Sequence, residues 1–185
     1  MAVVLVALAT GFEEIEAVSI IDTVRRSGII EVIIASVDTD GEVCGAHGIT
    51  IKTDKSINDV TADMIDMIVL PGGWGGTKIL AEHEKVQSLL KEMDIKGKHI
   101  GAICAAPFAL DKAGVLKEKY TCYPSVEEQI GNNGYDATKK VISDKNILTS
   151  RGPATAICFG LEIVKILVGE EIKQNVKEGL LADFC

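Results

Sequence analysis

The sequence contains few aromatic side chains and no long uncharged hydrophobic run. Phe, Trp and Tyr together make up 4 % of the chain, so aliphatic side chains have to fill any core. No uncharged run approaches the ~18–20 residues that a bilayer-spanning helix needs. The apolar start at Met1–Phe12 also lacks the basic segment and the cleavage site of a secretory signal. These absences predict a cytoplasmic protein that does not bind a membrane.

Paired cysteine motifs and an excess of basic charge are also absent. The five cysteines are widely spread and form no Cys-x-x-Cys pair, which argues against a secreted disulfide framework and a zinc ribbon and favours a reducing compartment. Nineteen Lys and Arg residues stand against 27 Asp and Glu residues, giving a formal net charge of −8. Because this charge repels phosphate backbones and anionic lipid surfaces, nucleic acid is not an expected partner.

The remaining composition is that of one folded domain. With 185 residues, 47 % hydrophobic and 25 % charged, the chain can bury a core without a disulfide or a metal, and we expect a single domain over residues 1–185. Short apolar runs alternate with longer segments of helical period. This alternation is typical of the α/β class, with a doubly wound, mostly parallel sheet and helices on both faces.

The expected elements follow from this alternation. Strands are predicted at Ala2–Ala9, Glu31–Val37, Asp66–Leu70 and His99–Ile103, with a small hairpin in Val43–Lys52 and two late strands in Lys139–Thr149. Helices are predicted around Ala17–Val24, Val86–Met93, Ala105–Ala113 and Ile157–Val168, with a loop at Pro71–Gly76.

Cys104 lies where a buried strand turns directly into a helix. Its sulfur can then face the positive end of the helix dipole, which lowers the pKa of a thiol and favours a nucleophilic thiolate. The small neighbours Ala102, Ala105 and Ala106 suit the tight turn of a nucleophile elbow. The alternative, a buried cysteine that packs as a small hydrophobic side chain, is kept for the other cysteines. These are Cys44, Cys122, Cys158 and Cys185.

Three acids open the first predicted helix. For Glu13 and Glu14 we expect ordinary charges at a helix N-terminus, where the dipole favours them. Glu16 lies one turn before Ile20, at the edge of the apolar stripe, where burial would raise the pKa of its carboxyl group. A neutral carboxyl group there can donate a hydrogen bond to the Cys104 thiolate.

The Gly72-Gly73 turn has two interpretations. Its pattern matches neither common phosphate-binding loop, and the acids after the first strand would repel a pyrophosphate, so nucleotide binding is discounted. The turn either directs a backbone N–H toward the site, forming an oxyanion hole with the N–H of Ala105, or is an ordinary tight turn. The three histidines have no metal-ligand spacing, so we expect no metal site.

Four segments, in chain order, resemble the ThiJ/PfpI superfamily along nearly the whole chain, within the branch of the parkinsonism-associated protein deglycase and its bacterial counterparts. They are Gly11–Glu16, Leu70–Gly73, Ala102–Pro107 and Thr149–Pro153. The resemblance implies a flavodoxin-like sheet and a homodimer built partly on the first helix. It also implies that Cys104 is the reactive cysteine, that Glu16 is its hydrogen-bonding acid, and that Gly73 and Ala105, with Gly72 beside them, hold an oxyanion.

The sequence departs from the family pattern at two positions. The protease-like members carry His directly after the cysteine, where this chain has Ala105, so peptidase activity is not expected. Some members of the nearer branch carry His before the proline at Pro124, where this chain has Tyr123. The Tyr123 hydroxyl is instead a candidate substrate-binding group. For the homodimer, we expect Arg25 and Arg26 to pair with Glu13 and Glu14 across a two-fold axis.

Two classes of function are compatible with these residues. The resemblance implies a cofactor-independent glyoxalase or deglycase, in which Cys104 attacks 2-oxoaldehydes such as methylglyoxal, or early glycation adducts, as a protection in carbonyl and oxidative stress. The alternative is a redox-sensing or chaperone protein, in which Cys104 is oxidised to a sulfinic acid that Glu16 stabilises. Both classes require a reactive cysteine beside an acid, so the sequence alone does not separate them.

Overall fold

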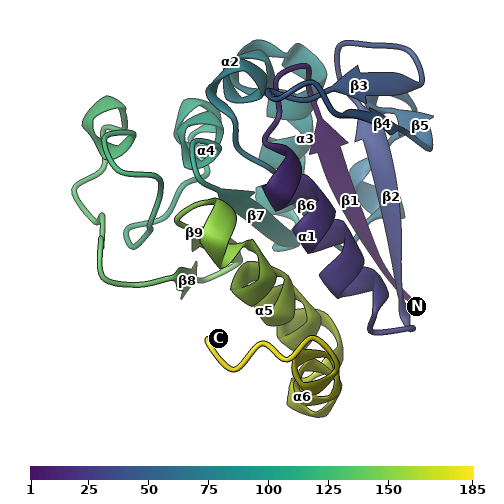
Figure 1. Ribbon diagram of the computed structural model, residues 1–185. Coiled ribbons are helices and arrows are strands. Elements are labelled where there is room, and N and C mark those ends of the chain that lie inside the picture. The colour runs from purple at the N-terminus through teal and green to yellow at the C-terminus, as the bar shows by residue number, and fades with distance from the viewer.

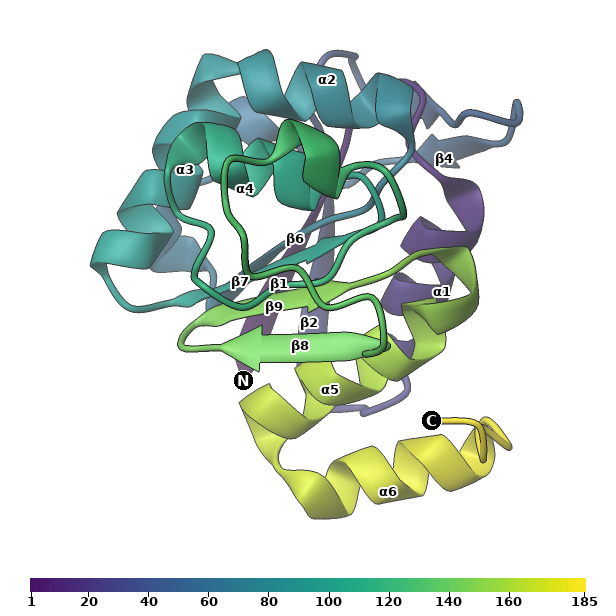
Figure 2. The same ribbon diagram turned by 90° about the vertical axis from the view of Figure 1, so that its left-hand side faces the viewer.

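The computed structural model describes residues 1–185 and contains one seven-stranded sheet (Figures 1 and 2). The strand order is β5-β2-β1-β6-β7-β9-β8, and every neighbouring pair is parallel except β8 with β9. The strands are β1 (Ala2–Leu8), β2 (Ile30–Ser36), β5 (Lys55–Ser56), β6 (Met67–Leu70), β7 (His99–Ile103), β8 (Val141–Asp144) and β9 (Ile147–Ser150). A separate antiparallel hairpin pairs β3 (Glu42–Cys44) with β4 (Thr50–Lys52).

Helices cover both faces of the sheet (Figure 2). One layer holds α1 (Glu14–Arg25), α5 (Ala156–Val168) and α6 (Glu170–Gly179), and the other holds α2 (Trp74–Glu82), α3 (Glu84–Ile95) and α4 (Pro107–Ala113). Short 3₁₀ helices lie at Ile57–Asp59, Ala62–Met64, Glu127–Gln129 and Pro153–Thr155. No helix is long and apolar enough to span a bilayer.

The central strand β1 divides the core into two halves. Val4, Val6 and Leu8 belong to the cluster that packs beneath α1 and α5, whereas Leu5 and Ala7 belong to the cluster that packs against α3 and α4. Successive side chains of a strand point to opposite faces, and here both faces are covered. This explains why β1 is apolar without interruption, and it confirms the predicted flavodoxin-like α/β fold.

Two helices were not expected from the sequence. The loop predicted to extend to Gly76 is wrong, because α2 already begins at Trp74. Glycine is a poor helix former, but a Cβ atom at Gly76 would lie 3.0 Å from the backbone nitrogen of Phe12, so the close approach of α2 to the β1–α1 loop favours glycine. The last helix, α6, packs against α5 after the predicted stop at Gly169.

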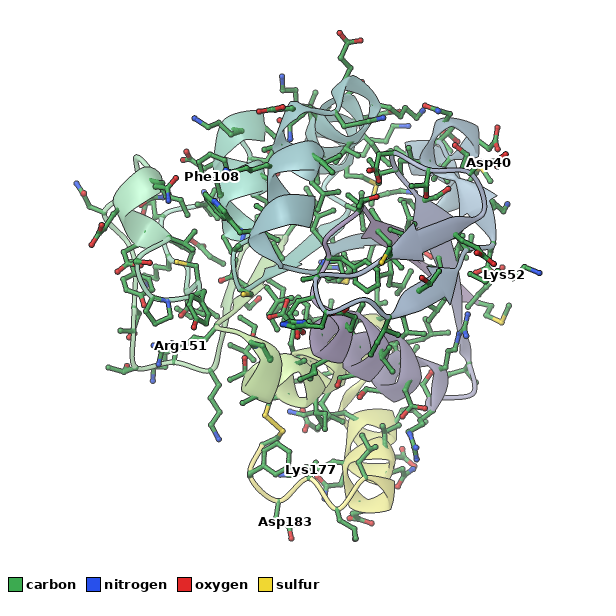
Figure 3. The ribbon with its side chains drawn as sticks, turned by 45° about the horizontal axis from the view of Figure 1, so that its top comes forward. Asp40, Lys52, Phe108, Arg151, Lys177 and Asp183 are labelled. Carbon is green, nitrogen blue, oxygen red and sulfur yellow. A yellow bond between two sulfur atoms is a disulfide. The ribbon has the colours of Figure 1, made fainter.

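The expectation that all five cysteines are unpaired is also wrong. Cys158 in α5 forms a disulfide with Cys185 at the C-terminus, drawn as a yellow bond in Figure 3. Cys158 is buried, and the tail brings Cys185 back along α5. No spacing pattern indicates this pair, because the two residues are 27 positions apart and no Cys-x-x-Cys motif marks them. Cys44 is exposed, contrary to the expected buried packing.

Cys158→Ser is expected to lower the free energy of unfolding in buffer without a reducing agent. Without the disulfide, a 27-residue loop is no longer closed in the unfolded chain. The conformational entropy that the unfolded chain regains corresponds to about 3.5 kcal/mol of lost stability. Urea unfolding followed by circular dichroism measures it, with Cys44→Ser as the matched control because that thiol is free. Equal unfolding curves for wild type and Cys158→Ser would show that the disulfide does not stabilise the fold.

Candidate active site

Three loops converge at the carboxyl ends of the central strands. The segment after β1 leads to Glu16 in the first turn of α1, the segment after β6 contains Gly72 and Gly73, and the turn after β7 carries Cys104. Since β1, β6 and β7 are parallel neighbours, all three segments emerge at one edge of the sheet, which is where open α/β sheets bind ligands. The structure thus brings together the residues that the sequence singled out.

Cys104 occupies a strained turn between β7 and α4. Its backbone φ angle is +63°, in the left-handed region that costs a non-glycine residue on the order of 1–3 kcal/mol. Two hydrogen bonds hold this backbone: its N–H donates to the Ser150 carbonyl at 3.0 Å, and its carbonyl accepts from the Tyr123 N–H at 2.9 Å. The side chain is 8 % exposed, so the turn presents a nearly buried sulfur to the site.

Glu16 lies directly beside this sulfur. Its side chain is fully buried, and its Oε2 atom accepts a 2.7 Å hydrogen bond from the Gly72 N–H. The Oε1 atom accepts no hydrogen bond from an N–H or O–H group, and the Cys104 thiol lies close enough to interact with the carboxyl group. Burial raises the pKa of Glu16 to about 7, against the opposing effect of the Gly72 hydrogen bond. The predicted upward shift is therefore confirmed.

The expected lowering of the Cys104 pKa is not found. Burial raises the pKa of this thiol, and the negative charge of an ionised Glu16 raises it further. Hydrogen bonds from the backbone N–H groups of Gly73 and Ala105 act in the opposite direction but are the smaller effects. The helix α4, only seven residues long, does not offset burial. The Cys104 thiolate thus forms most readily when its proton moves to Glu16, because this neutralises the negative charge of Glu16 that opposes ionisation of the thiol.

The two candidate oxyanion donors both face the sulfur. The N–H groups of Gly73 and Ala105 are the backbone groups that hydrogen-bond to Cys104. Gly73 has a φ angle of +85°, and a Cβ atom there would lie 2.4 Å from the Gly11 carbonyl oxygen, so only glycine fits this turn. A turn of this geometry is compatible with both interpretations of the Gly72-Gly73 segment.

Gly72→Ala is expected to disrupt the site directly. An added Cβ atom would lie 2.6 Å from the Cβ atom of Cys104 and 2.8 Å from the Oε2 atom of Glu16, so both side chains would have to move. Overpacking of this kind costs about 1–3 kcal/mol of stability, and we expect Cys104 alkylation to slow at least about tenfold. Thermal unfolding and alkylation rates measure the two effects. Gly131→Ala is the control, because a Cβ atom there meets nothing within 4 Å. Wild-type rates in Gly72→Ala would contradict the close packing described.

Comparison with known proteins places this geometry in a family. The sequence pattern of the DJ-1/PfpI family matches residues 2–166. The chain belongs to the DJ-1/PfpI family. It is 42 % identical over 182 residues to Protein dj-1beta of Drosophila melanogaster, covering 97 % of each chain. The crystal structure of Drosophila melanogaster DJ-1beta aligns with a TM-score of 0.93 at 41 % identity, over 97 % of each chain.

Other DJ-1/PfpI relatives match over similar lengths. Glutathione-independent glyoxalase DJR-1.2 of Caenorhabditis elegans is 39 % identical over 175 residues, which are 94 % of this chain and 90 % of that protein. The structure of oxidized Toxoplasma gondii DJ-1 aligns with a TM-score of 0.92 at 37 % identity over 98 % of each chain. The resemblance found in the four sequence segments is therefore confirmed across the whole fold.

Tyr123, which departs from the pattern expected for the DJ-1/PfpI family, lies at the edge of the site. Its N–H bonds to Cys104, while its side chain is 50 % exposed and its ring packs over Gly152. The hydroxyl group is thus free to contact a bound molecule. The preceding residue, Cys122, is fully buried, and burial raises the pKa of its thiol to about 12. Cys122 therefore remains a packing residue.

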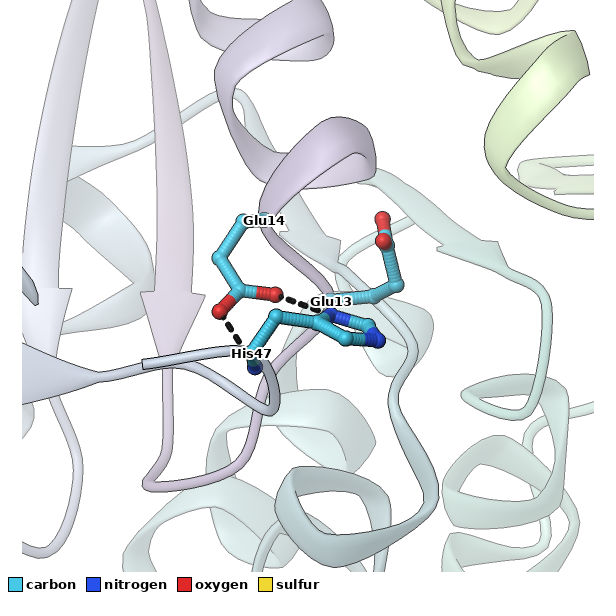
Figure 4. A group of neighbouring side chains, drawn as sticks. All are labelled: Glu13, Glu14 and His47. Carbon is cyan, nitrogen blue, oxygen red and sulfur yellow. Dashed lines mark hydrogen bonds and ion pairs between the residues drawn. The ribbon is translucent and has the colours of Figure 1, made fainter. Parts of the chain in front are cut away.

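Glu13 and Glu14 differ from the exposed helix-end charges that the sequence suggested. Both are buried, and Glu13 caps α1 by accepting from the Glu16 N–H at 2.7 Å. Glu14 accepts from the backbone N–H of His47 at 2.6 Å and contacts its ring nitrogen at 2.8 Å (Figure 4). The pKa of Glu14 is raised by burial, but hydrogen bonds from His47 and Ile49 outweigh this, so it lies below its usual value.

Glu13, Glu14 and His47 together form a cluster whose side chains are of the types that bind metal ions. Potential ligand atoms of Glu13, Glu14 and His47 lie within 4.8 Å of one another. Glu14, however, already accepts two backbone N–H groups, from His47 and Ile49, and so anchors the β3–β4 hairpin to the start of α1. The hydrogen bond to Glu14 raises the pKa of His47. No local pattern predicts the contact between Glu14 and His47, because 33 positions separate the two residues.

Proposed function

We propose that this DJ-1/PfpI protein is a cofactor-independent glyoxalase that converts 2-oxoaldehydes such as methylglyoxal to 2-hydroxy acids. The observation that carries the proposal is the contact of a strained, nearly buried Cys104 with Glu16, whose pKa of about 7 suits proton transfer at neutral pH. The name of the Caenorhabditis elegans relative, a glutathione-independent glyoxalase, supports the same chemistry.

The first step forms a carbon–sulfur bond. The Cys104 proton passes to Glu16, and the thiolate attacks the aldehyde carbon, C1, of methylglyoxal. The electrons of the C1–O double bond move to oxygen, where the N–H groups of Gly73 and Ala105 stabilise the negative charge. Return of the proton from Glu16 to this oxygen gives a neutral hemithioacetal.

The second step moves hydrogen within the substrate. The Glu16 carboxylate removes the proton from C1, and the electron pair forms a C1–C2 double bond as the C2 carbonyl oxygen becomes negative, giving an enediolate. The proton of the C1 hydroxyl group moves to the C2 oxygen, and Glu16 then returns its proton to C2 as the C1–O double bond forms. The product is a thioester at C1 with a hydroxyl group at C2. Water then attacks the thioester, the carbon–sulfur bond breaks, and lactate leaves as the Cys104 thiol is restored. Methylglyoxal and water are the only reactants consumed, so no oxidant or reductant is needed.

The same first step supports action on early glycation adducts. A hemiaminal or hemithioacetal adduct reverts to the free amine or thiol and the 2-oxoaldehyde, and Cys104 then adds to that aldehyde, while Tyr123 at the rim is half-exposed. Peptidase activity is not proposed, because Ala105 supplies no imidazole next to the nucleophile.

A redox-sensing role is the second candidate function. The supporting observation is the buried Oε1 atom of Glu16, which has no ordinary partner and lies beside the sulfur. In a sulfinic acid at Cys104, an oxygen could accept a hydrogen bond from a protonated Glu16. The similar Toxoplasma gondii structure is that of oxidized DJ-1, which supports oxidation chemistry within the family.

Lactate formation distinguishes the two functions. Purified protein is incubated with methylglyoxal in the absence of glutathione, and lactate is measured over time. The proposed glyoxalase produces lactate catalytically, many equivalents per protein chain. A sensor would produce none, while mass spectrometry after peroxide treatment would show two added oxygen atoms on Cys104. Cys122→Ser serves as a control in both measurements, because Cys122 lies outside the proposed reaction path.

A homodimer remains part of the proposal, but on a different basis from the expected charge pairing. Glu13 and Glu14 are buried, and Arg26 pairs with Asp22 of its own helix at 2.7 Å. These groups are therefore not available to pair across a two-fold axis. The outer face of α1 instead exposes Ile15 and Val18, at 59 % and 49 % of their surface, and apolar side chains of this kind favour association.

A further inference from the structure

A cavity of about 440 Å³ lies next to the candidate active site. Tyr123 forms part of its wall, and the Tyr123 N–H is bonded to the Cys104 carbonyl. Arg151, which also lines the cavity, follows β9 at the same sheet edge where Cys104 follows β7, because Ile103 and Ser150 are paired neighbours. Figure 3 shows Arg151 on the side of the molecule where the segment between α4 and β8 lies. The cavity therefore lies at the sheet edge that carries Cys104, and Tyr123 of its wall is hydrogen-bonded to the Cys104 backbone.

The lining of this cavity is cationic in a chain that is otherwise acidic. Lys139, Lys140 and Arg151 contribute to it, and no Asp or Glu does, although the chain has a net charge of −8. None of the three forms an ion pair within 4.0 Å. Asp136, three positions before Lys139, accepts hydrogen bonds from the Thr138 N–H and hydroxyl groups at 2.8 and 2.6 Å.

Arg151 supplies the strongest indication of a missing anion. Its Nε atom is buried and has no hydrogen-bond partner, and a buried donor left unpaired costs about 1–3 kcal/mol, more for a charged group. Carboxylate and phosphate oxygens are the acceptors that a guanidinium group binds best. Lys140, by contrast, is partly engaged, because its Nζ atom donates to the Phe184 carbonyl.

The backbone also contributes to the positive electrostatic potential of the cavity. Gly152, Pro153, Ala154 and Thr155 line the cavity and lead directly into α5, a 13-residue helix. The start of this helix faces the cavity with the positive end of its dipole, which favours an anion. The unpaired Arg151 Nε atom, the two lysines and the start of α5 thus all lie at this one cavity.

We propose that this cavity binds the carboxylate or phosphate group of an anionic carbonyl compound whose aldehyde reacts at Cys104. The reaction at Cys104 rests on the proposed function, whereas the binding of the anion does not. The preferred substrate class is then a 2-oxoaldehyde or glycation adduct that carries a negative charge, and neutral methylglyoxal fills only the reacting half of the site.

Anion binding is tested without any turnover. Inorganic phosphate and acetate are titrated separately into ¹⁵N-labelled protein, and backbone amide shifts report binding and distinguish a phosphate site from a carboxylate site. Binding of at least one anion is expected, with shifts at Gly152 and Ala154. Lys139→Gln and Arg151→Gln should each weaken it about tenfold, which is 1.4 kcal/mol. Lys91→Gln, an exposed charge on α3, is the control and should leave it unchanged.

A second arm tests the position of the anion relative to Cys104. Iodoacetate and iodoacetamide alkylate the same sulfur but differ in charge, so their rate ratio reports recruitment of the carboxylate. The rate with iodoacetate divided by the rate with iodoacetamide is expected to fall at least about threefold in Lys139→Gln and in Arg151→Gln. Addition of phosphate to the wild type should lower this ratio in the same way. Lys139 is exposed, so its variant remains informative if Arg151→Gln folds poorly.

The outcomes separate the two proposals. Absence of phosphate and acetate binding, or equal binding by wild type and both variants, overturns the anion site even if methylglyoxal is converted to lactate. Anion binding with an unchanged alkylation ratio overturns its link to Cys104. Anion binding and a changed ratio, in a protein that forms no lactate, support the site and reject the glyoxalase.

Discussion

Cys104→Ser is expected to reduce lactate formation from methylglyoxal by at least about 10³-fold. A serine hydroxyl group keeps the size of the side chain but does not ionise near neutral pH. Glu16, with a pKa of about 7, can accept a proton from a thiol far more easily than from an alcohol. The attack that forms the hemithioacetal therefore loses its nucleophile, while the N–H groups of Gly73 and Ala105 remain in place.

The measurement is the initial rate of lactate formation by wild type and variant at equal concentration of folded protein. Cys122→Ser provides the matched control, since it removes a buried thiol that has a pKa raised to about 12. Its rate should stay close to that of the wild type. Turnover by Cys104→Ser within a few-fold of wild type would mean that the reaction does not use this sulfur.

Glu16→Gln is expected to change both the rate of alkylation of Cys104 and its dependence on pH. The glutamine oxygen can still accept the Gly72 N–H, but the amide cannot take up a proton. In the wild type, the pair loses its first proton near pH 7, the raised pKa of Glu16, and a second proton only at much higher pH, because burial and the Glu16 charge oppose it. Alkylation should therefore rise up to pH 7 and then level off.

In Glu16→Gln the thiol has no internal proton acceptor, although the repulsion from a carboxylate is also removed. Burial still raises the pKa of Cys104, so the rate should continue to rise about tenfold per pH unit into the alkaline range. Because half of the wild-type molecules carry a neutral Glu16 at pH 7, the two rates should be similar there, and above pH 7 the variant should become the faster because the Glu16 charge no longer raises the pKa of Cys104. Iodoacetamide kinetics between pH 5 and 10 measure this. Two profiles of the same shape would leave Glu16 without a role in proton transfer.

The parallel sheet and the turn at Cys104 could be predicted from the sequence because local patterns determine them. Ala2–Leu8 is apolar throughout, as a strand covered on both faces must be, and the structure places β1 in the interior of the sheet, between β2 and β6. The order of strand, small residues and helix around Cys104 likewise indicated a tight turn. Burial of Glu16 followed from its place beside the apolar stripe of α1.

The remaining features depend on contacts between distant segments. Glycines at Gly75 and Gly76 suggested a loop, but both lie inside α2, where close packing against Phe12 favours glycine at Gly76. The Cys158–Cys185 disulfide requires the tail to return along α5, which residue spacing does not reveal. The sign of the Cys104 pKa shift depends on how deeply three loops bury the sulfur, and that depth is a property of the assembled site.

The central claim, that Cys104 is the reactive thiol of this chain, is tested most directly by substoichiometric labelling with iodoacetamide at pH 7 and peptide mapping. Three thiols are free in the folded protein: Cys44, Cys104 and Cys122. Cys104 should carry most of the label, because Glu16 accepts its proton and two backbone N–H groups stabilise the thiolate. Preferential labelling of the exposed Cys44 or of the buried Cys122 would contradict the account.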